Sequence, residues 1–367
     1  MKHALIWVAL LAIFVACSRT GHRDISALAG ETPLVQGAQE KGGDPAIGTA
    51  KTFDNLTVFA VTSKSQDDIG PITTLDIALA KRTAQVKEVG ADRSSRGDGA
   101  QVNSLVIENH GDVPIYVLAG TIVKGGKQDR QIGDDFIVGA HQTVPVDAFC
   151  VEHGRWTTNR EGIATGGQFG VVGMLAESKV RTAAQYERNQ GQVWAKVAAV
   201  NAANKKEAAS GTLLASLDAS DIAAKRAALA SKVEGYFETI RPGDGVVGFA
   251  YALDGKVRSV RWFASHRVFQ MFRSTLVNTA AMEAITAQSQ AAATGQPAAA
   301  APVASGDVSK FVSEVESGRL KEQRSTPALN DNEFRESKSG YGATTVLKGA
   351  GGGATRPRPV SKSVTSF

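Results

Sequence analysis

Two polar segments carry side chains that could act together on a ligand. The first, Gly125-Gly126-Lys127-Gln128-Asp129-Arg130, directly follows an apolar stretch. Paired glycines permit backbone conformations closed to other residues, so their N–H groups can approach a ligand closely. A guanidinium such as that of Arg130 can hold a phosphate or carboxylate with two hydrogen bonds, and Asp129 can accept from a hydroxyl or orient the arginine. The alternative is a tight turn in which Asp129 and Arg130 pair with neighbouring side chains and fix a loop.

The second segment is Phe149-Cys150-Val151-Glu152-His153-Gly154-Arg155-Trp156. Side chains alternate along a strand, so Cys150 and Glu152 share one face and His153 takes the other. Glu152 would act as an acid or base, Arg155 as an anion clamp and Trp156 as a stacking platform. The alternative is a buried Glu152–Arg155 pair that finishes the strand, with the tryptophan in the core.

Several better-defined chemistries lack their signatures in this chain. The six histidines show no HExxH or other metal-ligand spacing, and a single free cysteine argues against a structural zinc site. No GxSxG nucleophile elbow is present, and the glycine-rich residues 166–173 follow neither the dinucleotide nor the P-loop pattern. His153 should face away from Cys150, which argues against a Cys/His pair. We therefore expect neither a metal ion nor another cofactor.

The N-terminus has the pattern of an export signal. Lys2 and His3 precede an apolar stretch over residues 4–16, which is too short to span a bilayer, and polar sequence begins at Ser18. The stretch ends on Val15-Ala16-Cys17, which resembles the lipobox of bacterial lipoproteins. This resemblance implies cleavage before Cys17, lipid on that cysteine and, with Ser18 next in the chain, sorting to the outer membrane. We expect a cell-envelope protein attached to the membrane through this lipid.

The composition divides the chain into five parts. Residues 1–17 are the expected signal peptide, residues 18–52 a flexible tether, and residues 53–287 the ordered domain. Residues 288–343 start with an Ala/Pro-rich stretch and are expected to be a low-complexity, disordered linker. Residues 344–367 are expected to be a tail with short strands at 344–347 and 360–367. The formal net charge of +5 is a mild excess without a basic stripe, so nucleic acid is not an expected partner.

Within residues 53–287, short strands come first and helices follow. Alternating stretches such as 53–61 and 143–151 fit strands, and Asp254-Gly255 marks the clearest hairpin, between residues 246–253 and 256–263. Helices are expected over 74–80, 177–204, 221–240 and 268–287. The expected fold class is α+β, an antiparallel short-strand sandwich or partly open barrel with a helical portion packed on it.

Taken together, the two polar segments, Gln192-Val193-Trp194 and the hairpin-plus-helix at 246–285 resemble the ARPP family. The family is named for its association with ADP-ribosylglycohydrolases and rhodanese-like phosphatases, and the resemblance covers roughly residues 53–287. It implies no established activity, but it does imply a link to ADP-ribose or nucleotide-derived metabolites. The residues that match its polar motifs are Gln128, Asp129, Arg130, Glu152, Arg155 and Trp156. The export signal and the C-terminal tail are not part of that pattern, and an envelope location argues against a cytosolic nucleotide substrate.

Three functions are consistent with the sequence. The leading hypothesis is an envelope-anchored module that binds a polar anionic small molecule related to ADP-ribose or a nucleotide. The second is a hydrolase in which Glu152 is the general base while Arg130 and Arg155 hold an anion. The third is a structural envelope lipoprotein. The first two require that the two polar segments converge on one site.

Overall fold

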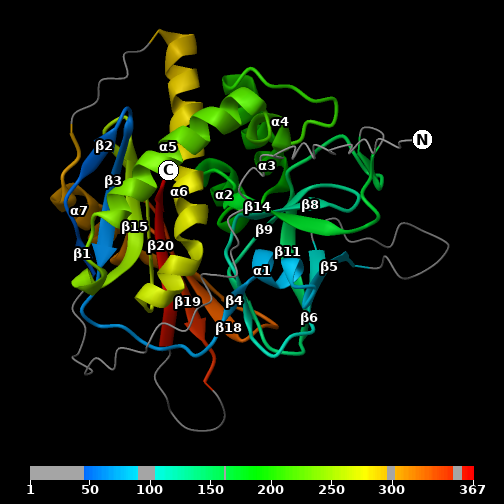
Figure 1. Ribbon diagram of the computed structural model, residues 1–367, viewed down its shortest axis with the longest axis horizontal. Coiled ribbons are helices and arrows are strands. Elements are labelled where there is room, and N and C mark those ends of the chain that lie inside the picture. Colours follow the sequence, from blue (N-terminus) through cyan, green and yellow to red (C-terminus); the bar gives the residue numbers. More distant parts are fainter. Residues whose placement is uncertain (1–44, 90–103, 161–162, 296–301, 350–357) are drawn as a thin grey trace, which may run out of the picture. The chain divides into compact units, whose positions relative to one another are not determined.

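The computed structural model describes residues 45–89, 104–160, 163–295, 302–349 and 358–367, and Figure 1 shows their arrangement. Cys17 and the rest of the expected signal lie outside these residues. Among the described helices, none is both long enough and apolar enough to cross a bilayer.

A tight hairpin forms the middle of the larger sheet. Strands β15 (Val246–Leu253) and β16 (Lys256–Phe263) are joined by Asp254 and Gly255, whose φ angles are 49° and 73°. Two successive residues with positive φ form a type I′ turn, and its twist matches that of the paired strands. The hairpin expected from the Asp-Gly pair is confirmed.

Nine antiparallel strands make up this sheet, in the order β1-β3-β15-β16-β20-β19-β18-β17, with β2 paired to β3. Besides the hairpin they are β1 (Ala46–Ile47), β2 (Lys51–Phe53), β3 (Leu56–Thr62), β17 (Arg319–Ser325), β18 (Asn330–Glu336), β19 (Gly340–Leu347) and β20 (Arg358–Ser366). The hairpin joins the two ends of the described chain, because β15 pairs with β3 and β16 pairs with β20. The tether predicted over 18–52 is therefore wrong at its end, where β1 and the start of β2 belong to the sheet.

The prediction of a disordered linker over 288–343 is also wrong for the described part of that range. Helix α7 (Ser305–Glu316) and strands β17 and β18 are ordered there, and β19 begins at Gly340. Val308, Phe311, Val312 and Val315 of α7 are buried at helical spacing, although polar residues surround them in the sequence. Strands β17 and β18 consist mostly of charged and amide residues, so they lack the apolar alternation by which strands are recognised. The ordered domain therefore runs from residue 45 to residue 367 through the described residues, and not from 53 to 287.

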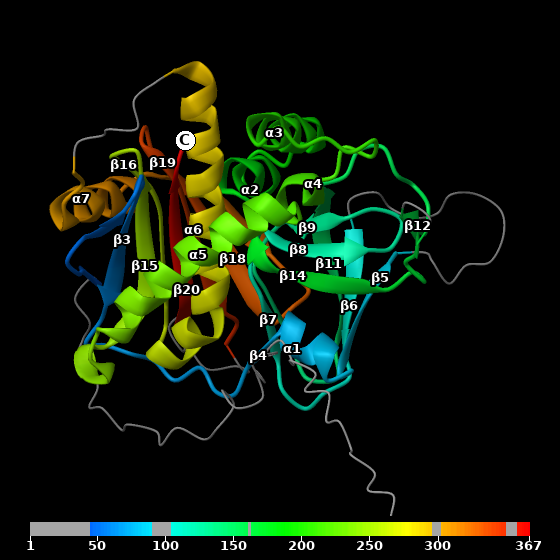
Figure 2. The same ribbon diagram turned by 45° about the horizontal axis from the view of Figure 1, so that its top comes forward.

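The remaining strands form two further sheets and a small hairpin. Six strands pair in the order β14-β8-β9-β11-β6-β5, three pair in the order β10-β7-β4, and β12 pairs with β13. Their bounds are β4 (Thr73–Thr74), β5 (Ala84–Glu88), β6 (Ser104–Asn109), β7 (Ile115–Val117), β8 (Thr121–Gly125), β9 (Arg130–Ile132), β10 (Phe136–Val138), β11 (Thr143–Cys150), β12 (Asn159–Arg160), β13 (Ile163–Ala164) and β14 (Phe169–Leu175). Leu105 and Ile107 of β6 share one apolar core with Ile115 of β7 and Val138 of β10. These strands curl around that core as a partly open barrel (Figure 2), and the predicted α+β class is confirmed.

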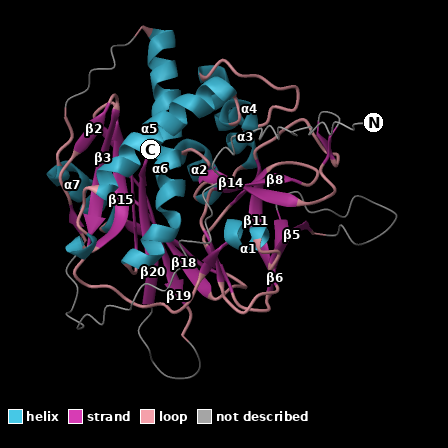
Figure 3. Cartoon of the chain, viewed as in Figure 1, coloured by secondary structure: helices cyan, strands magenta, loops and turns pink. Residues whose placement is uncertain are grey.

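Most of the helices follow the barrel in sequence, and α5 and α6 among them pack on the larger sheet (Figure 3). They are α2 (Ser178–Gln185), α3 (Gln190–Ala203), α4 (Leu214–Leu217), α5 (Ser220–Glu238) and α6 (His266–Thr294), after the short α1 (Leu75–Ala80) and with a 3₁₀ turn at Pro242–Asp244. Val58 of β3 packs with α5 and α6, whereas its neighbour Phe59 packs with α7, so the helices lie on opposite faces of the sheet. The single helix predicted over 177–204 is instead split into α2 and α3 before Gln190, where Arg188 has a φ of 51°.

A buried carboxylate ties the C-terminal strands to the barrel. Asp135 Oδ2 accepts hydrogen bonds from Tyr116 at 2.7 Å, Arg261 Nη2 at 2.6 Å and Thr345 at 2.9 Å. Burial raises its pKa, but Arg261 and the hydrogen bonds it accepts outweigh burial and lower the pKa below its ordinary value. Because the three donors come from β7, β16 and β19, Asp135 fixes the barrel against the larger sheet.

Candidate functional site

The two polar segments meet on neighbouring strands. Strand β11 pairs with β9, and Cys150 lies directly opposite Arg130. Beyond the paired residues, the backbone N–H of Asp129 donates to Glu152 Oε2 at 3.0 Å. The convergence that the sequence-based hypotheses required is therefore present, and what each side chain can do depends on its partners.

Arg155 is fully committed to the protein itself. Its Nε donates to both carboxylate oxygens of Glu152 at 3.0 Å, and its Nη2 donates to Glu152 Oε2 at 2.7 Å. Nη1 donates to the carbonyls of Gly126 and Thr157 at 2.8 and 2.7 Å, and Nη2 donates also to Gly125 O at 3.1 Å. A guanidinium has five N–H donors, so none is left for a ligand. Arg155 is buried and holds the loops of both segments together.

The two carboxylates beside Arg155 are likewise parts of this network. Asp129 Oδ1 accepts from Gly125 N–H at 3.0 Å, and its Oδ2 accepts from Thr212 at 2.9 Å. Burial raises the pKa of Glu152, but hydrogen bonds from Arg155 and the Asp129 N–H outweigh it and lower that pKa below its ordinary value. A carboxylate with a lowered pKa, whose oxygens already accept hydrogen bonds from Arg155 and the Asp129 N–H, is a poor general base.

The paired glycines serve packing. A Cβ on Gly125 would lie 1.9 Å from the carbonyl oxygen of Gln168, and a Cβ on Gly126 would lie 2.2 Å from the ring of Phe169. Their N–H groups bond to Asp129 and to Gln168 O. The φ angles of 141° and 47° also favour glycine at both positions. The glycine pair therefore lets two chain segments pass in contact, and its N–H groups are occupied within the protein.

Arg130 differs from Arg155 in its partners. It is 1% exposed, and its Nη1 donates to Gln128 Oε1 and Cys150 Sγ, both at 2.9 Å. Its Nε has no hydrogen-bond partner, and no carboxylate of the described residues lies within ion-pairing distance of its guanidinium. Gln128, which is buried, also donates to the carbonyl of His153 at 3.3 Å. A buried cation whose contacts are uncharged is energetically costly, which makes Arg130 the unusual residue of the cluster.

An aromatic ring and a second cation lie next to Arg130. The guanidinium carbon is 5.5 Å from the centroid of the Trp156 ring, and Lys127 Nζ is 5.6 Å from the same ring. Trp156 and Lys127 are both partly exposed. The Trp156 ring is thus within cation–π distance of both a buried and a partly exposed cation.

Cys150 completes the surroundings of Arg130. Its side chain is fully buried. Burial raises the pKa of its thiol, although the charge of Arg130 opposes that effect. Gln190 fixes the backbone of Cys150, because its amide accepts from Cys150 N and donates to Cys150 O, both at 2.8 Å. The residue is therefore a protonated, packed thiol.

Sequence reasoning missed Lys127 and Asp135. Lys127 stands within the predicted segment, and its place after two glycines was the available signal. The two adjacent carboxylates Asp134 and Asp135 directly precede the apolar strand β10, and this position was the available signal for Asp135. Nothing in the sequence indicated that its partners would lie more than two hundred residues away at Thr345 and Ser361.

The fold defines an α+β protein in which one chain forms both a partly open barrel and a larger sheet packed with helices. Its candidate site is the buried polar network where β9 and β11 of the barrel lie side by side. The chain belongs to the family of the ARG and Rhodanese-Phosphatase-superfamily-associated Protein domain, ARPP-1, whose model matches residues 44–353. The match includes α7 and β17 to β19, in agreement with their place in the folded domain. No curated protein and no solved structure matches the chain. The family description names an association with ADP-ribosylglycohydrolase and rhodanese-phosphatase proteins and specifies no reaction.

Proposed function

We propose that this protein is an envelope-anchored module that binds an anionic small molecule, with Arg130 as the residue that meets the negative charge. The supporting observation is the partner set of Arg130, a buried guanidinium whose hydrogen bonds go to an amide and a thiol. Burying a charge without a counter-ion costs several kcal/mol. An anion bound at Arg130 Nε would offset that cost. Arg155 gives no such gain, because Glu152 already neutralises its charge.

The neighbouring side chains suggest the chemical class of the ligand. Trp156 is a partly exposed aromatic residue on which a base can stack, and the partly exposed Lys127 adds a positive charge beside it. ADP-ribose and related nucleotides combine an aromatic base with negatively charged phosphate groups. The family's association with ADP-ribosylglycohydrolases supports the same class.

The hydrolase alternative has weaker support from the geometry. Glu152 is held by Arg155 and by the Asp129 N–H, and these bonds lower its pKa. Abstracting a proton from water requires a base whose pKa is near the working pH. The site therefore favours ligand binding over hydrolysis. The third hypothesis, a structural lipoprotein that binds no small molecule, is tested by the thermal-shift comparison below.

The membrane attachment is proposed from the sequence alone. Val15-Ala16-Cys17 closes the apolar stretch of the export signal, and we propose lipid on Cys17 and a location at the outer membrane. Changing Cys17 to Ala should abolish lipid labelling and move the protein out of the membrane fraction. Unchanged labelling and fractionation in that variant would disprove the anchor.

A thermal-shift comparison tests the ligand class. The wild-type protein is heated with ADP-ribose, AMP, inorganic phosphate, a neutral sugar and a peptidoglycan fragment, and binding to the native state raises the melting temperature. We expect the nucleotide ligands to give the largest rise and the neutral sugar none. The Arg130→Gln variant should lose that rise, whereas Arg273→Gln, an arginine paired with Glu234 at 2.8 Å elsewhere in the fold, should keep it. A shift that is the same in all three proteins would rule out Arg130 as the anion contact.

A further inference from the structure

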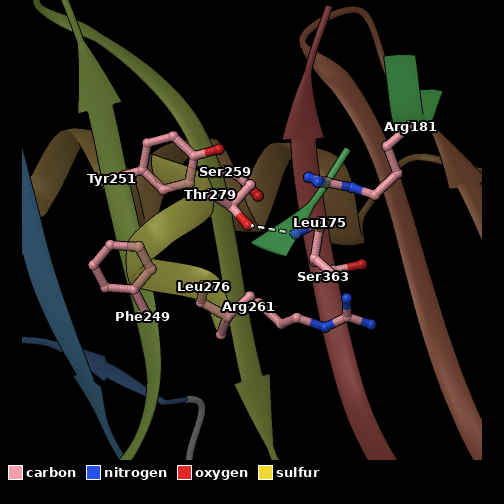
Figure 4. A pocket seen from close by; sticks show the side chains of 9 residues that line it. All are labelled: Leu175, Arg181, Phe249, Tyr251, Ser259, Arg261, Leu276, Thr279 and Ser363. Carbon is pink, nitrogen blue, oxygen red and sulfur yellow. Dashed lines mark hydrogen bonds between the residues drawn. The ribbon is translucent and has the colours of Figure 1, made fainter. Parts of the chain in front are cut away.

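A small polar cavity lies between the larger sheet and the helices on its inner face (Figure 4). Its polar lining comes from Arg181 of α2, Tyr251 of β15, Ser259 and Arg261 of β16, Thr279 of α6 and Ser363 of β20. The cavity has a volume of about 20 Å³. A single water molecule needs roughly 10–15 Å³ on the same measure, so the space suits one species of about that size.

Arg181 brings an unpaired charge to this cavity. The residue is only 7% exposed, and its one hydrogen bond runs from Nη1 to the carbonyl of Ala176 at 3.0 Å. No carboxylate of the described residues lies within ion-pairing distance of it. Figure 4 shows its guanidinium reaching from α2 toward Ser259. Gly120 makes room for the side chain, because a Cβ there would lie 2.8 Å from Arg181 Cδ.

The other charged groups near the cavity have hydrogen-bond partners of their own. Arg261 pairs with Asp135 at 2.6 Å, although its Nε has no partner. Glu283 accepts hydrogen bonds from the backbone N–H and the hydroxyl of Ser178 at the start of α2. Burial and then the charge of Glu283 raise the pKa of Tyr251 well above its ordinary value, so that hydroxyl keeps its proton. Arg181 is therefore the one charged residue of the cavity lining that makes no ion pair with a described residue.

The remaining lining groups suit an anion. Ser259 and Ser363 border the cavity, and their hydroxyls can each donate a hydrogen bond. Thr279 is not available, since its oxygen accepts from Leu175 N–H at 2.9 Å and donates to Thr275 O at 2.7 Å. The cavity thus combines a guanidinium that makes no ion pair with a described residue and two serine hydroxyls, in a space too small for a tetrahedral oxyanion.

We infer that this cavity is a binding site for one monatomic anion with the size and charge of chloride. The anion neutralises Arg181 where α2 meets β15, β16 and β20, and it stabilises the native state because the site exists only in the folded chain. The site is separate from Arg130 and does not depend on the proposed ligand.

The test is thermal unfolding of the full chain at constant ionic strength, with sodium chloride replacing sodium gluconate from 5 to 150 mM. For a Kd of about 5 mM, chloride should raise the melting temperature by roughly 3 °C in a domain of this size. Bromide should act like chloride, whereas sulfate should have no effect beyond that of gluconate. The Arg181→Met variant, which keeps the length of the side chain, should lose the dependence, and Arg273→Met should retain it.

Crystals soaked in bromide give an independent measurement that needs no variant. Anomalous scattering should place a bromide ion in the cavity within hydrogen-bonding distance of Arg181. A wild-type melting temperature that ignores chloride, or a cavity holding only water in the bromide soak, would overturn the inference. An equal chloride effect in Arg181→Met would also overturn it, since the effect would then arise elsewhere.

Discussion

Arg155 binds Glu152 through two nitrogens, Nε at 3.0 Å and Nη2 at 2.7 Å, in a pair that is almost entirely buried. Arg130, on the neighbouring strand, is equally buried but contacts an amide and a thiol. Two arginines that look alike in the sequence therefore have opposite electrostatic situations. One completes the architecture of the cluster, and the other leaves a charge for a ligand to neutralise.

Removing Arg155 should destabilise the protein strongly. The Arg155→Met variant leaves Glu152 buried without its cation, and breaking one partner of a buried pair typically costs about 3–5 kcal/mol. Denaturant unfolding should show that loss in the free energy of unfolding, with little change in its denaturant dependence. A loss below about 1 kcal/mol would mean that the carboxylate is not held by this pair.

Removing Arg130 should have the opposite effect on stability. Arg130→Met replaces an uncompensated buried charge by an apolar chain of similar length, and such changes are often neutral or stabilising by about 1–4 kcal/mol. The same denaturant experiment, with Arg155→Met as the matched control, measures the contrast. If both variants lose comparable stability, Arg130 is part of the architecture and the binding proposal loses its support.

A chain that ends at residue 287 should not fold. The truncation removes β20, which pairs with β16, and it removes the donors Thr345 and Ser361 from the buried carboxylate of Asp135. An exposed long strand edge also promotes aggregation. Circular dichroism and size-exclusion chromatography should show an aggregated product without a cooperative melting transition. A monomeric truncated protein that melts cooperatively would show that residues 53–287 are a domain by themselves.

Stability should fall as the pH rises through the neutral range, because of Glu177. Burial, and then the charge of Glu283, raise its pKa from 4.5 to about 8. The folded state therefore holds a proton that the unfolded state releases near pH 4.5, so this contribution is complete below pH 4.5 and is lost by about pH 8. Glu177→Gln cannot titrate, and its stability relative to the wild type should rise by up to several kcal/mol from pH 4.5 to pH 8.5. An unchanged difference between the two proteins over that range would refute the assignment.

The sequence predicted the parts of this fold that follow local patterns. Alternating apolar residues gave strands such as β3 and β11, and Asp254-Gly255 gave the hairpin. The short strands expected at 344–347 and 360–367 lie within β19 and β20, whereas β17 and β18 escaped prediction because β17 has no buried residue and two of the three buried residues of β18 are asparagines. The side-chain amides of Asn330 and Asn332 donate hydrogen bonds to the carbonyl of Asp135. A strand held by such bonds has a hydrophilic sequence, which is also typical of a disordered tail.

The candidate site was predictable in position and not in role. Strand alternation brought Arg130 and Glu152 toward one region, and the structure has both residues there. The difference between Arg130 and Arg155 depends on which carboxylate reaches which guanidinium, and spacing along the chain does not determine that. Arg181 had no signal at all, since it is a lone arginine in a helix whose other residues are mostly small or apolar.

Isothermal titration calorimetry with ADP-ribose is the most direct test of the central claim, that Arg130 meets the charge of an anionic ligand. We expect the wild-type protein to bind and Arg130→Gln to bind more weakly by about 1.5–3 kcal/mol, the usual contribution of a charged hydrogen bond. Arg273→Gln should bind like the wild type. Trp156→Ala should also weaken ADP-ribose while leaving inorganic phosphate unaffected, because phosphate has no base to stack. Equal affinity of the wild type and Arg130→Gln, or no heat of binding with the wild type for any nucleotide or phosphate, would contradict the account.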